Sequence, residues 1–524
     1  MSELRSDVRF RSGRVRKKRR ASSKTPLFAS QHAPLLKVAL GLFAVHIVGA
    51  PMLLGGVHAW AIVTIAISAC LCLIAAAVAA RARLSDTAPI VVWVAVGLLA
   101  WTALQVLPLP CSLVSMLAPD AVATLRADRA MLGLSSPTTC RLTLDPGGTQ
   151  EEVLKGVAIV ASLLAAWLLA RAKAHREVLW MVAASSLVMS AVALVHGLGR
   201  MDEVFGLYTP QRAGRQLLLA PLMNQNNLGA FAAMGVPLWI ALTHRVRSPG
   251  VRWLGLAAVI TTVATALLSL SRGAIAQLLV SLLLVLWVVQ VSPRRSSGRP
   301  LAQRLLRPLA TVLAIAIAGA GVLYAASDRL ASELENRDLS KLGLIRRAFQ
   351  LALDHLWVGI GRGAFASAFV HLEGASARFG YAENFVVQWL SEWGAPITLL
   401  WLAVAARALY DAARGSESLA RKGALIALFG LVLQNLVDLG FEVLGMAVVA
   451  AALFAAIVAS ARPEPNPVST PRSLYAPTFL VLGGAIAALL LIAPHIGAQS
   501  VSELDAKLRQ QMHADDRPGF RATL

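Results

Sequence analysis

The chain alternates long apolar segments with short polar ones over most of its length. About thirteen of these apolar segments have roughly 20 residues, the length of α-helix that crosses the hydrocarbon core of a bilayer. The pattern predicts an all-α, polytopic membrane protein with about 12–13 transmembrane helices and a large helical periplasmic loop. The expected spans are residues 34–56, 57–80, 87–107, 152–171, 177–197, 217–243, 253–271, 273–291, 308–327, 386–410, 423–438, 443–461 and 474–494.

The same pattern divides the chain into a single membrane domain with two polar tails. We expect a basic cytoplasmic tail at 1–33, a polytopic membrane domain at 34–498 and a C-terminal tail at 499–524. The longest outer segment of the membrane domain is the loop at 328–384. The basic tail either binds anionic lipid head groups or serves as a topology anchor, and we favour the anchor. It is not a cleavable signal peptide, because no short apolar core with a small-residue cleavage site follows it.

Composition and charge narrow the class of protein. A hydrophobic content of 57% and a mean hydropathy of +0.65 exclude an ordinary soluble globular protein. In a soluble protein the net charge of +21 would favour nucleic acid as a partner. Here, however, more than half of the 49 Lys and Arg residues fall in segments on one predicted side of the membrane. This bias is typical of cytoplasmic loops, so membrane lipids and no nucleic acid are the expected partners.

The stretch RFGYAENFVVQWLSEWGAP, at 378–396, places several polar side chains at the edge of an apolar segment. Polar groups are costly in hydrocarbon and favour a functional interpretation. At about 100° per residue, Asn384, Gln388, Ser391 and Glu392 share one helical face. We expect this polar face to line a cavity, with Glu383 at its outer end.

Two further stretches bring polar groups to the mouths of predicted spans. Asn224 begins a run of four amides at the start of one span, and Arg272 separates two apolar spans. The amides either cap helices or contact a polar ligand. Arg272 either extends towards the interface or binds a phosphate, and its rigid donor fork favours the phosphate. Arg212 and Arg215 lie in the preceding outer loop.

The loop at 328–384 contains an amphipathic helix. Its apolar positions recur at helical spacing (Leu342, Ile345, Phe349 and Leu353), and Lys341, Arg346 and Arg347 flank them. The glycine-rich segment 359–363 that follows lacks the context of a nucleotide-binding loop. We interpret it as a closely packed turn in which Arg362 is an additional anion contact.

Four cysteines and a second polar patch complete the candidates. Cys111 and Cys140 lie in one outer loop, and a disulfide between them is expected if that compartment is a periplasm. The alternative is two unpaired thiols. Cys70 and Cys72 lie in a predicted span, where they serve as small apolar residues. The second patch, at 434–442, is interpreted as structural, with Asp438 paired to an outer arginine.

Several of these stretches, in order, resemble the O-antigen ligase-like family of bacterial inner-membrane glycosyl transferases, which includes polysaccharide ligases and polymerases. The resemblance covers most of residues 100–440, and we place the family core at about 100–461. It rests on the segments QVLPLPCSLVSMLAP, LTLDPGGTQEEVLK, APLMNQNNLGAFAAM, LSLSRGAIAQLLVSLLL, LALDHLWVGIGRGAFASAF and AENFVVQWLSEWGAPITLLWL.

The resemblance implies transfer of a glycan from an undecaprenyl-diphosphate-linked donor to an acceptor hydroxyl, with inversion and without a metal or other cofactor. Glu383 stands where the family usually has His, and Lys341 where it usually has Arg. We expect catalytic roles for Glu383 and Arg272. The expected substrate-binding residues are Lys341, Arg346, Arg215, Asn224, Asn384 and Gln388.

The acceptor is a lipid or a glycan, and the sequence does not separate a ligase from a polymerase. Two alternatives from other classes are a polytopic carrier or flippase and an inactive scaffold of a surface-polysaccharide assembly system. A carrier would be expected to repeat broken helices in its two halves, and no such repeat is found in the sequence. The expected location is the bacterial inner membrane, with the active face towards the periplasm.

Overall fold

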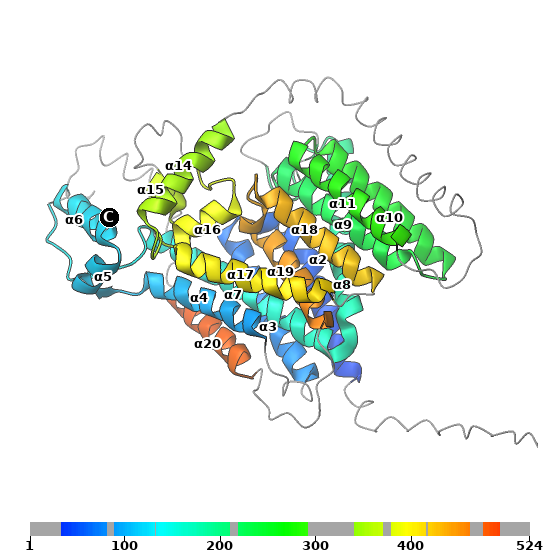
Figure 1. Cartoon of the computed structure of the whole chain (residues 1–524), viewed down its shortest axis with the longest axis horizontal. Helices are drawn as coiled ribbons and strands as arrows, with labels where there is room; N and C mark the ends of the chain where they lie inside the picture. Colours follow the sequence, from blue (N-terminus) through cyan, green and yellow to red (C-terminus); the bar gives the residue numbers. More distant parts are fainter. Residues whose placement is uncertain are drawn as a thin grey trace, which may run out of the picture.

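The described part of the computed structural model is almost entirely helical, as the apolar pattern predicts (Figure 1). The structure describes residues 33–80, 89–131, 133–209, 218, 220–291, 340–369, 379–414, 418–461 and 475–492. Its strands are a single antiparallel pair, β1 (Leu109–Pro110) and β2 (Thr139–Cys140). The all-α fold class is therefore confirmed for the described residues.

The helices follow the chain in this order: α2 (Ala33–Met52), α3 (Ala59–Ala79), α4 (Ile90–Val106), α5 (Cys111–Leu117), α6 (Pro119–Met131), α7 (Pro146–Leu169), α8 (His175–Leu198), α9 (Gln225–Thr243), α10 (Pro249–Leu268), α11 (Arg272–Val291), α14 (Ser340–Asp354), α15 (Phe365–Phe369), α16 (Phe385–Trp393), α17 (Ala395–Arg414), α18 (Leu419–Asn435), α19 (Leu444–Ala461) and α20 (Tyr475–Ile492). Short 3-10 turns lie at η1 (Leu54–Gly56) and η4 (Gly440–Glu442).

Seven helical segments of the described chain are long and apolar enough to cross a membrane. One of them, Pro146–Leu198, contains both α7 and α8. A π-helical turn at Ala170–Ala174 joins these two helices, and Lys173 has a φ of 70° there, so the two predicted spans are separate helices. The predicted span at 308–327 lies outside the described residues.

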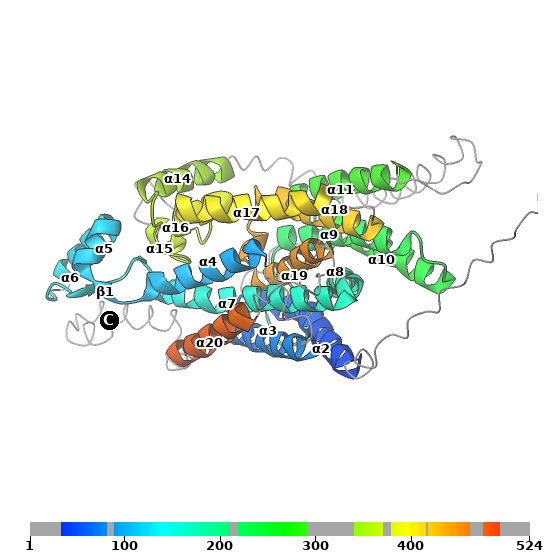
Figure 2. The same cartoon turned by 60° about the horizontal axis from the view of Figure 1, so that its bottom comes forward.

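Three helices form the centre of the bundle. α7 packs against α3 and α19, while α9 packs against α10, α11 and α18. Nearly every residue of α9 and of α19 is buried. Their sequences are rich in Ala and Gly. In a membrane the hydrophobic effect does not drive helices together, so they associate by close packing, which small residues allow. By contrast, α17 lies at the edge of the bundle (Figure 2).

The shorter helices gather at one end of the bundle, where α4 ends and α7 and α17 begin (Figures 1 and 2). We call this the loop end. It contains α5, α6, α14, α15 and α16. A disulfide between Cys111 and Cys140, with their Cα atoms 4.8 Å apart, closes the α5–α6 segment at this end. The predicted disulfide is thus confirmed, whereas Cys70 and Cys72 are free.

The cysteine pairing leads to a labelling prediction. Unfolded, unreduced protein should react with a maleimide at Cys70 and Cys72 only, and after reduction at all 4 cysteines. Intact-mass spectrometry counts the added labels. The matched control is Cys140→Ser, in which Cys111 becomes an additional reactive thiol without reduction. Labelling of all cysteines in unreduced wild-type protein would contradict the pairing.

Candidate functional site

Three helices begin near one another, each just after a residue with an unusual backbone conformation. Met223 precedes the N-cap of α9 with a φ of 59°, and Leu270 precedes the start of α11 with a φ of 56°. Glu383 precedes the N-cap of α16 with a φ of 55°. Left-handed conformations are costly for residues other than glycine, and they cluster at functional sites. This feature therefore marks the three helix starts as a candidate site.

Side-chain contacts join the starts of α9 and α11. A Cβ added at Gly229, in the second turn of α9, would lie 2.3 Å from Ser269 Oγ and 2.7 Å from Ala274 Cβ. Gln277 of α11 donates from Nε2 to the carbonyl oxygen of Ala230 at 3.1 Å. The first turns of the two helices are therefore in direct contact.

The last turn of α18 and the turn that follows it, residues 434–438, join α11 to α16. On one side of this segment, a Cβ added at Gly273 would lie 2.2 Å from Gln434 Oε1. On the other side, Asn384 Nδ2 donates to the carbonyl oxygen of Leu436 at 2.8 Å. Since Arg272 precedes Gly273 and Glu383 precedes Asn384, both predicted catalytic residues adjoin this turn. Arg272 is exposed and Glu383 is half-buried.

Two of the predicted binding amides are helix caps. Asn224 is the N-cap of α9 and accepts from the backbone N–H groups of Asn226, at 2.8 Å, and Asn227, at 3.4 Å. Asn384 is the N-cap of α16 and accepts from Val387 N at 3.0 Å. Asparagine is favoured at this position because its side-chain oxygen satisfies otherwise unpaired amides of the first turn. The capping role considered for Asn224 is thus the one the geometry shows.

Two buried amide oxygens at the same place have no hydrogen-bond partner among the described residues. They are Asn227 Oδ1, in the first turn of α9, and Gln434 Oε1, beside Gly273. A buried acceptor without a donor lowers the free energy of unfolding, and such groups are rare in native proteins. Hydroxyl groups of a ligand or ordered water are the donors that fit them.

Asp438 lies in the same turn and holds it in shape. It is 2% exposed, accepts from Gln434 Nε2 at 3.0 Å, and its other carboxylate oxygen accepts from Leu439 N at 2.8 Å. The sequence predicted a structural ion pair between Asp438 and an outer arginine. These two hydrogen bonds support a structural role for Asp438, and its pairing with an arginine stays a prediction.

The polar face of α16 does not line a cavity, contrary to the sequence-based expectation. Gln388, Ser391 and Glu392 are each no more than 1% exposed. Gln388 accepts from Ala382 N at 2.7 Å and donates to Glu392 Oε1 at 2.8 Å. The backbone of Ser391 accepts from Ile360 N at 2.8 Å. The expectation was wrong because the glycine-rich segment 359–363 packs on this face and uses its hydrogen-bonding groups.

Arg362, in that segment, is the centre of a buried ion-pair cluster. Its guanidinium binds carboxylate oxygens of Glu152 on α7, at 3.0 Å, of Glu392 on α16 and of Glu442 in η4. Its Cζ lies 5.1 Å from the ring centroid of Trp393, a cation–π distance. Arg362 is 7% exposed. Because the three glutamates already bind the guanidinium, the prediction that Arg362 contacts an anionic ligand is wrong.

Among the described residues, the cluster contains more acidic than basic groups. Its cations there are Arg362 and Lys155, and Lys155 is bound to Glu152 at 2.8 Å. Burial raises the pKa of Glu392 to about 7, although Arg362 acts in the opposite direction. The pKa of Arg362 is lowered by burial but raised further by Glu152, Glu442 and Glu392, and it lies well above its ordinary value. The carboxylates around Arg362 therefore keep its guanidinium positively charged.

Sequence reasoning missed most of this cluster. Glu152 and Lys155 stand three residues apart at the start of an otherwise apolar helix, and that spacing was the available signal. Glu442 was assigned only to a general polar patch. Their meeting with Arg362 depends on contacts between segments about 80 to 200 residues apart, which local patterns do not encode.

Two glycines let the segment reach α16. Gly359 has a φ of 69°, and a Cβ there would lie 2.4 Å from the backbone carbonyl of Glu392. Gly394 has a φ of 81°, and a Cβ there would lie 2.4 Å from the carbonyl oxygen of Trp357. Backbone meets backbone at both points, which confirms the interpretation of 359–363 as a closely packed turn.

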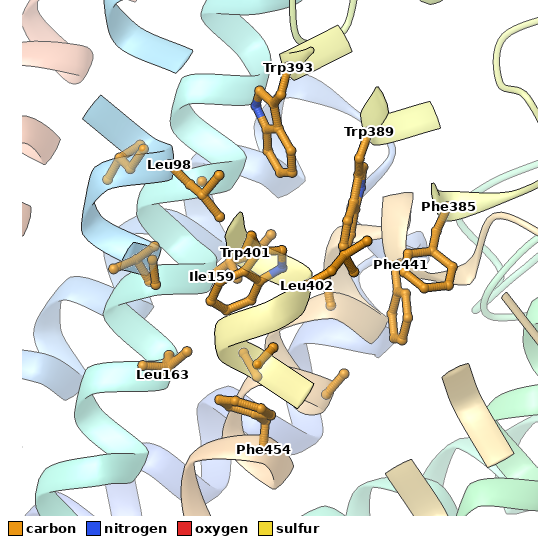
Figure 3. Close-up of a pocket in the computed structure, with 18 of the residues that line it drawn as sticks. Leu98, Ile159, Leu163, Phe385, Trp389, Trp393, Trp401, Leu402, Phe441 and Phe454 are labelled. Atoms are coloured by element: carbon orange, nitrogen blue, oxygen red, sulfur yellow. The ribbon is translucent and has the colours of Figure 1, made fainter. Parts of the chain in front are cut away.

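An apolar cavity of about 340 Å³ lies on the other side of α16. Figure 3 shows Trp393 and Trp389 of α16 at its upper edge, Phe385 at its right, Trp401 in its middle and Phe454 at its lower end. Residues of α4, α7, α17, α18, α19 and η4 complete the wall. Glu152 and Arg362 border it, but both are engaged in the ion-pair cluster. The cavity therefore suits a hydrocarbon chain and not an anionic group.

The remaining predicted residues lie elsewhere or cannot be placed. Arg346 is exposed on α14. Lys341 belongs to the same helix, but its side chain lies outside the described part of the structure, as does Arg215. Within the described residues, no group of three or more His, Cys, Asp or Glu residues is arranged to hold a metal ion.

Comparison with known families gives a match within this region. Residues 256–402 match the model of a family described as O-Antigen ligase. The matched segment contains Arg272, Arg346 and Glu383, which confirms the resemblance predicted from the ordered motifs. Asn224 and the α7 residues of the ion-pair cluster lie outside it. No curated protein matches the chain in a sequence comparison.

The ion-pair cluster yields a stability prediction. Arg362→Met should lower the free energy of unfolding by about 3 kcal/mol or more, because it leaves buried carboxylates without their cation. Thermal unfolding in detergent measures this. The matched control is Arg407→Met on α17, which removes an exposed pair with Asp411 and should leave the midpoint unchanged. Equal midpoints for the two variants would contradict the structural role of Arg362.

Proposed function

From the O-antigen ligase domain at residues 256–402, we propose that this protein transfers a glycan from an undecaprenyl-diphosphate-linked donor to an acceptor hydroxyl. The observation that carries the proposal is the coincidence of this domain with Arg272 and Glu383, which adjoin one turn at the loop end of a membrane bundle. The acceptor belongs to a lipid in a ligase or to a growing glycan in a polymerase.

The diphosphate of the donor is assigned to the starts of α9, α11 and α16. The N-terminus of an α-helix presents unpaired amide donors and a positive end of its dipole, both of which favour anions. Arg272, the first residue of α11, adds a fixed positive charge at the same place. Because negative charge increases on the diphosphate as it leaves, these groups stabilise the transition state more than the bound donor.

Glu383 is assigned the role of general base. The acceptor oxygen attacks the anomeric carbon from the side opposite the diphosphate, so the new glycosidic bond forms as the bond to the diphosphate breaks. The hydroxyl proton passes to the Glu383 carboxylate, and the anomeric configuration inverts. The left-handed backbone of Glu383 supports this role, because strain of this kind is maintained where a side chain must be held in one direction.

The apolar cavity supports a lipid-linked donor. It borders Phe385 and Phe441, close in sequence to Glu383 and Asp438 respectively, and extends from there along α17. Its wall is mostly hydrocarbon and aromatic, the environment that an isoprenoid chain prefers to water. In the proposed complex the diphosphate lies at the helix starts and part of the chain lies in the cavity.

The orientation proposed for this site follows from the charge bias of the loops. Among the described residues, the connections between α7 and α8 and between α9 and α10 lie away from the loop end and are basic (Arg171, Lys173 and Arg176; Arg245, Arg247 and Arg252). Such basic segments face the cytoplasm in bacterial inner membranes. The loop end, with Arg272 and Glu383, then faces the periplasm.

Substitution of the proposed base separates chemistry from stability. In Glu383→Gln, transfer by purified protein should fall by about 100-fold or more, while donor binding and the unfolding temperature stay near those of the wild type. Glu177→Gln, an exposed glutamate near the start of α8, is the matched control and should transfer normally. Full transfer by Glu383→Gln would remove Glu383 from the chemistry, and a lowered unfolding temperature would point to a structural carboxylate instead.

Substitution of the proposed diphosphate ligand should affect binding as well. Arg272→Ala should weaken donor binding by about tenfold or more, the effect of losing a charge-assisted hydrogen bond, and should also lower the rate of transfer. Arg252→Ala, near the start of α10, removes an exposed arginine from the first turn of another helix and is the control. Donor affinity can be followed by displacement of a labelled lipid diphosphate. Unchanged affinity in Arg272→Ala would exclude Arg272 from the diphosphate site.

A further inference from the structure

Helix α14 has two apolar faces, and the described residues of the protein cover one of them. Leu344, Ala348 and Leu351 are buried in a cluster with residues of α15 and α16. On the opposite side, Phe349 is 45% exposed and Leu353 is 52% exposed. These two residues belong to the periodic apolar set that the sequence predicted for this helix. Within this set Ile345 packs against the buried cluster, whereas Phe349 and Leu353 stay exposed among the described residues.

The exposed face continues towards the membrane-spanning part of the bundle. After α14 ends, Leu356 is 38% exposed and Trp357 is 73% exposed. The carbonyl oxygen of Leu356 accepts from the N–H of Ala395, the first residue of α17, at 2.7 Å. One turn further along α17, Leu399 is 56% exposed in a helix that is apolar enough to cross a membrane. Trp357 therefore stands at the level where a spanning helix begins.

The orientation of α14 differs from that of the spanning helices. Figure 1 shows α14 crossing the direction of α17 steeply, and Figure 2 shows both along the same edge of the molecule. A helix that crosses the spans steeply at their end lies close to the plane of the membrane. Arg346 and Arg347 are exposed on α14, near the level of lipid phosphates in this arrangement.

We propose that α14 is an interfacial helix that rests on the leaflet at which α17 begins. Phe349 and Leu353 contact the acyl region, Trp357 lies at the boundary, where tryptophan is enriched, and Arg346 faces the phosphates of anionic lipids. Lipid is favoured over a second protein because the exposed face is continuous with the start of a lipid-facing helix and has arginines beside it. The inference does not depend on the proposed transfer reaction.

Site-directed spin labelling of the full-length protein tests this proposal. Nitroxides are placed by Phe349→Cys, Leu353→Cys or Trp357→Cys in a background in which the free thiols are removed by Cys70→Ala and Cys72→Ala. The protein is studied in nanodiscs of phosphatidylethanolamine and phosphatidylglycerol. Collisions with oxygen, which concentrates in lipid, are compared with collisions with a water-soluble nickel chelate. The matched control is Gln350→Cys, an exposed position on the polar side of the same helix.

We expect a severalfold higher ratio of oxygen to nickel accessibility at positions 349, 353 and 357 than at 350. Equal ratios at the apolar positions and at 350 would show that the face is in water and would overturn the proposal. Low accessibility to both reagents at 349 and 353 would show that protein covers the face, which also overturns it. Each variant carries one label at an exposed position, so loss of folding is not expected to obscure the result.

Discussion

The fold at the loop end depends on one buried cation. Arg362 binds carboxylates from three other parts of the chain: α7, α16 and η4. None of these charges is stable alone in an apolar bundle, because the cost of removing an ion from water is recovered only in a complete, hydrogen-bonded cluster. The four segments therefore take their positions together or not at all. This cooperativity fixes α16, although α16 has only 9 residues.

Helix α16 connects the cluster to the candidate site and to the cavity. On its polar face, the Glu392 carboxylate and the backbone carbonyls of Ser391 and Glu392 bind the segment at 359–363. Its aromatic face forms part of the cavity wall, and its N-cap, Asn384, is bonded to the turn after α18. A short helix fixed on three sides is a rigid support, and rigid supports are what catalytic geometry requires. These contacts hold the backbone that carries Glu383.

The sequence predicted those features that depend on local patterns. Apolar length predicted the spanning helices, the loop periodicity predicted α14, and a shared compartment predicted the pairing of Cys111 with Cys140. The sequence-based prediction failed where it had to say which part of the protein covers a given face of a helix. The polar face of α16 was expected to meet a cavity and instead meets Ile360 and Arg362. Periodicity tells which residues share a face but not what covers that face, since the cover comes from distant segments.

The candidate site was predictable to a similar degree. Arg272 and Glu383 stood out because ionisable groups are rare at the ends of apolar segments. What the sequence could not supply was the turn that both adjoin, or the left-handed backbone of Glu383, because neither leaves a residue pattern of its own. Arg362 was predicted to contact an anionic ligand, but it binds three carboxylates of the protein itself. These carboxylates lie on other elements, so the local sequence did not reveal them.

Helix α17 is less buried than the other described helices that are long and apolar enough to cross a membrane. Of its 20 residues, Thr398 and Ala412 are the buried ones, and the helix forms one wall of the aromatic cavity. Because the outer side of this wall is exposed where lipid would lie, we expect a hydrocarbon chain to exchange between the cavity and the bilayer without crossing water. The rate of that exchange is then governed by the fluidity of the surrounding lipid, and a membrane that stiffens on cooling would slow the protein even if its chemistry were unchanged.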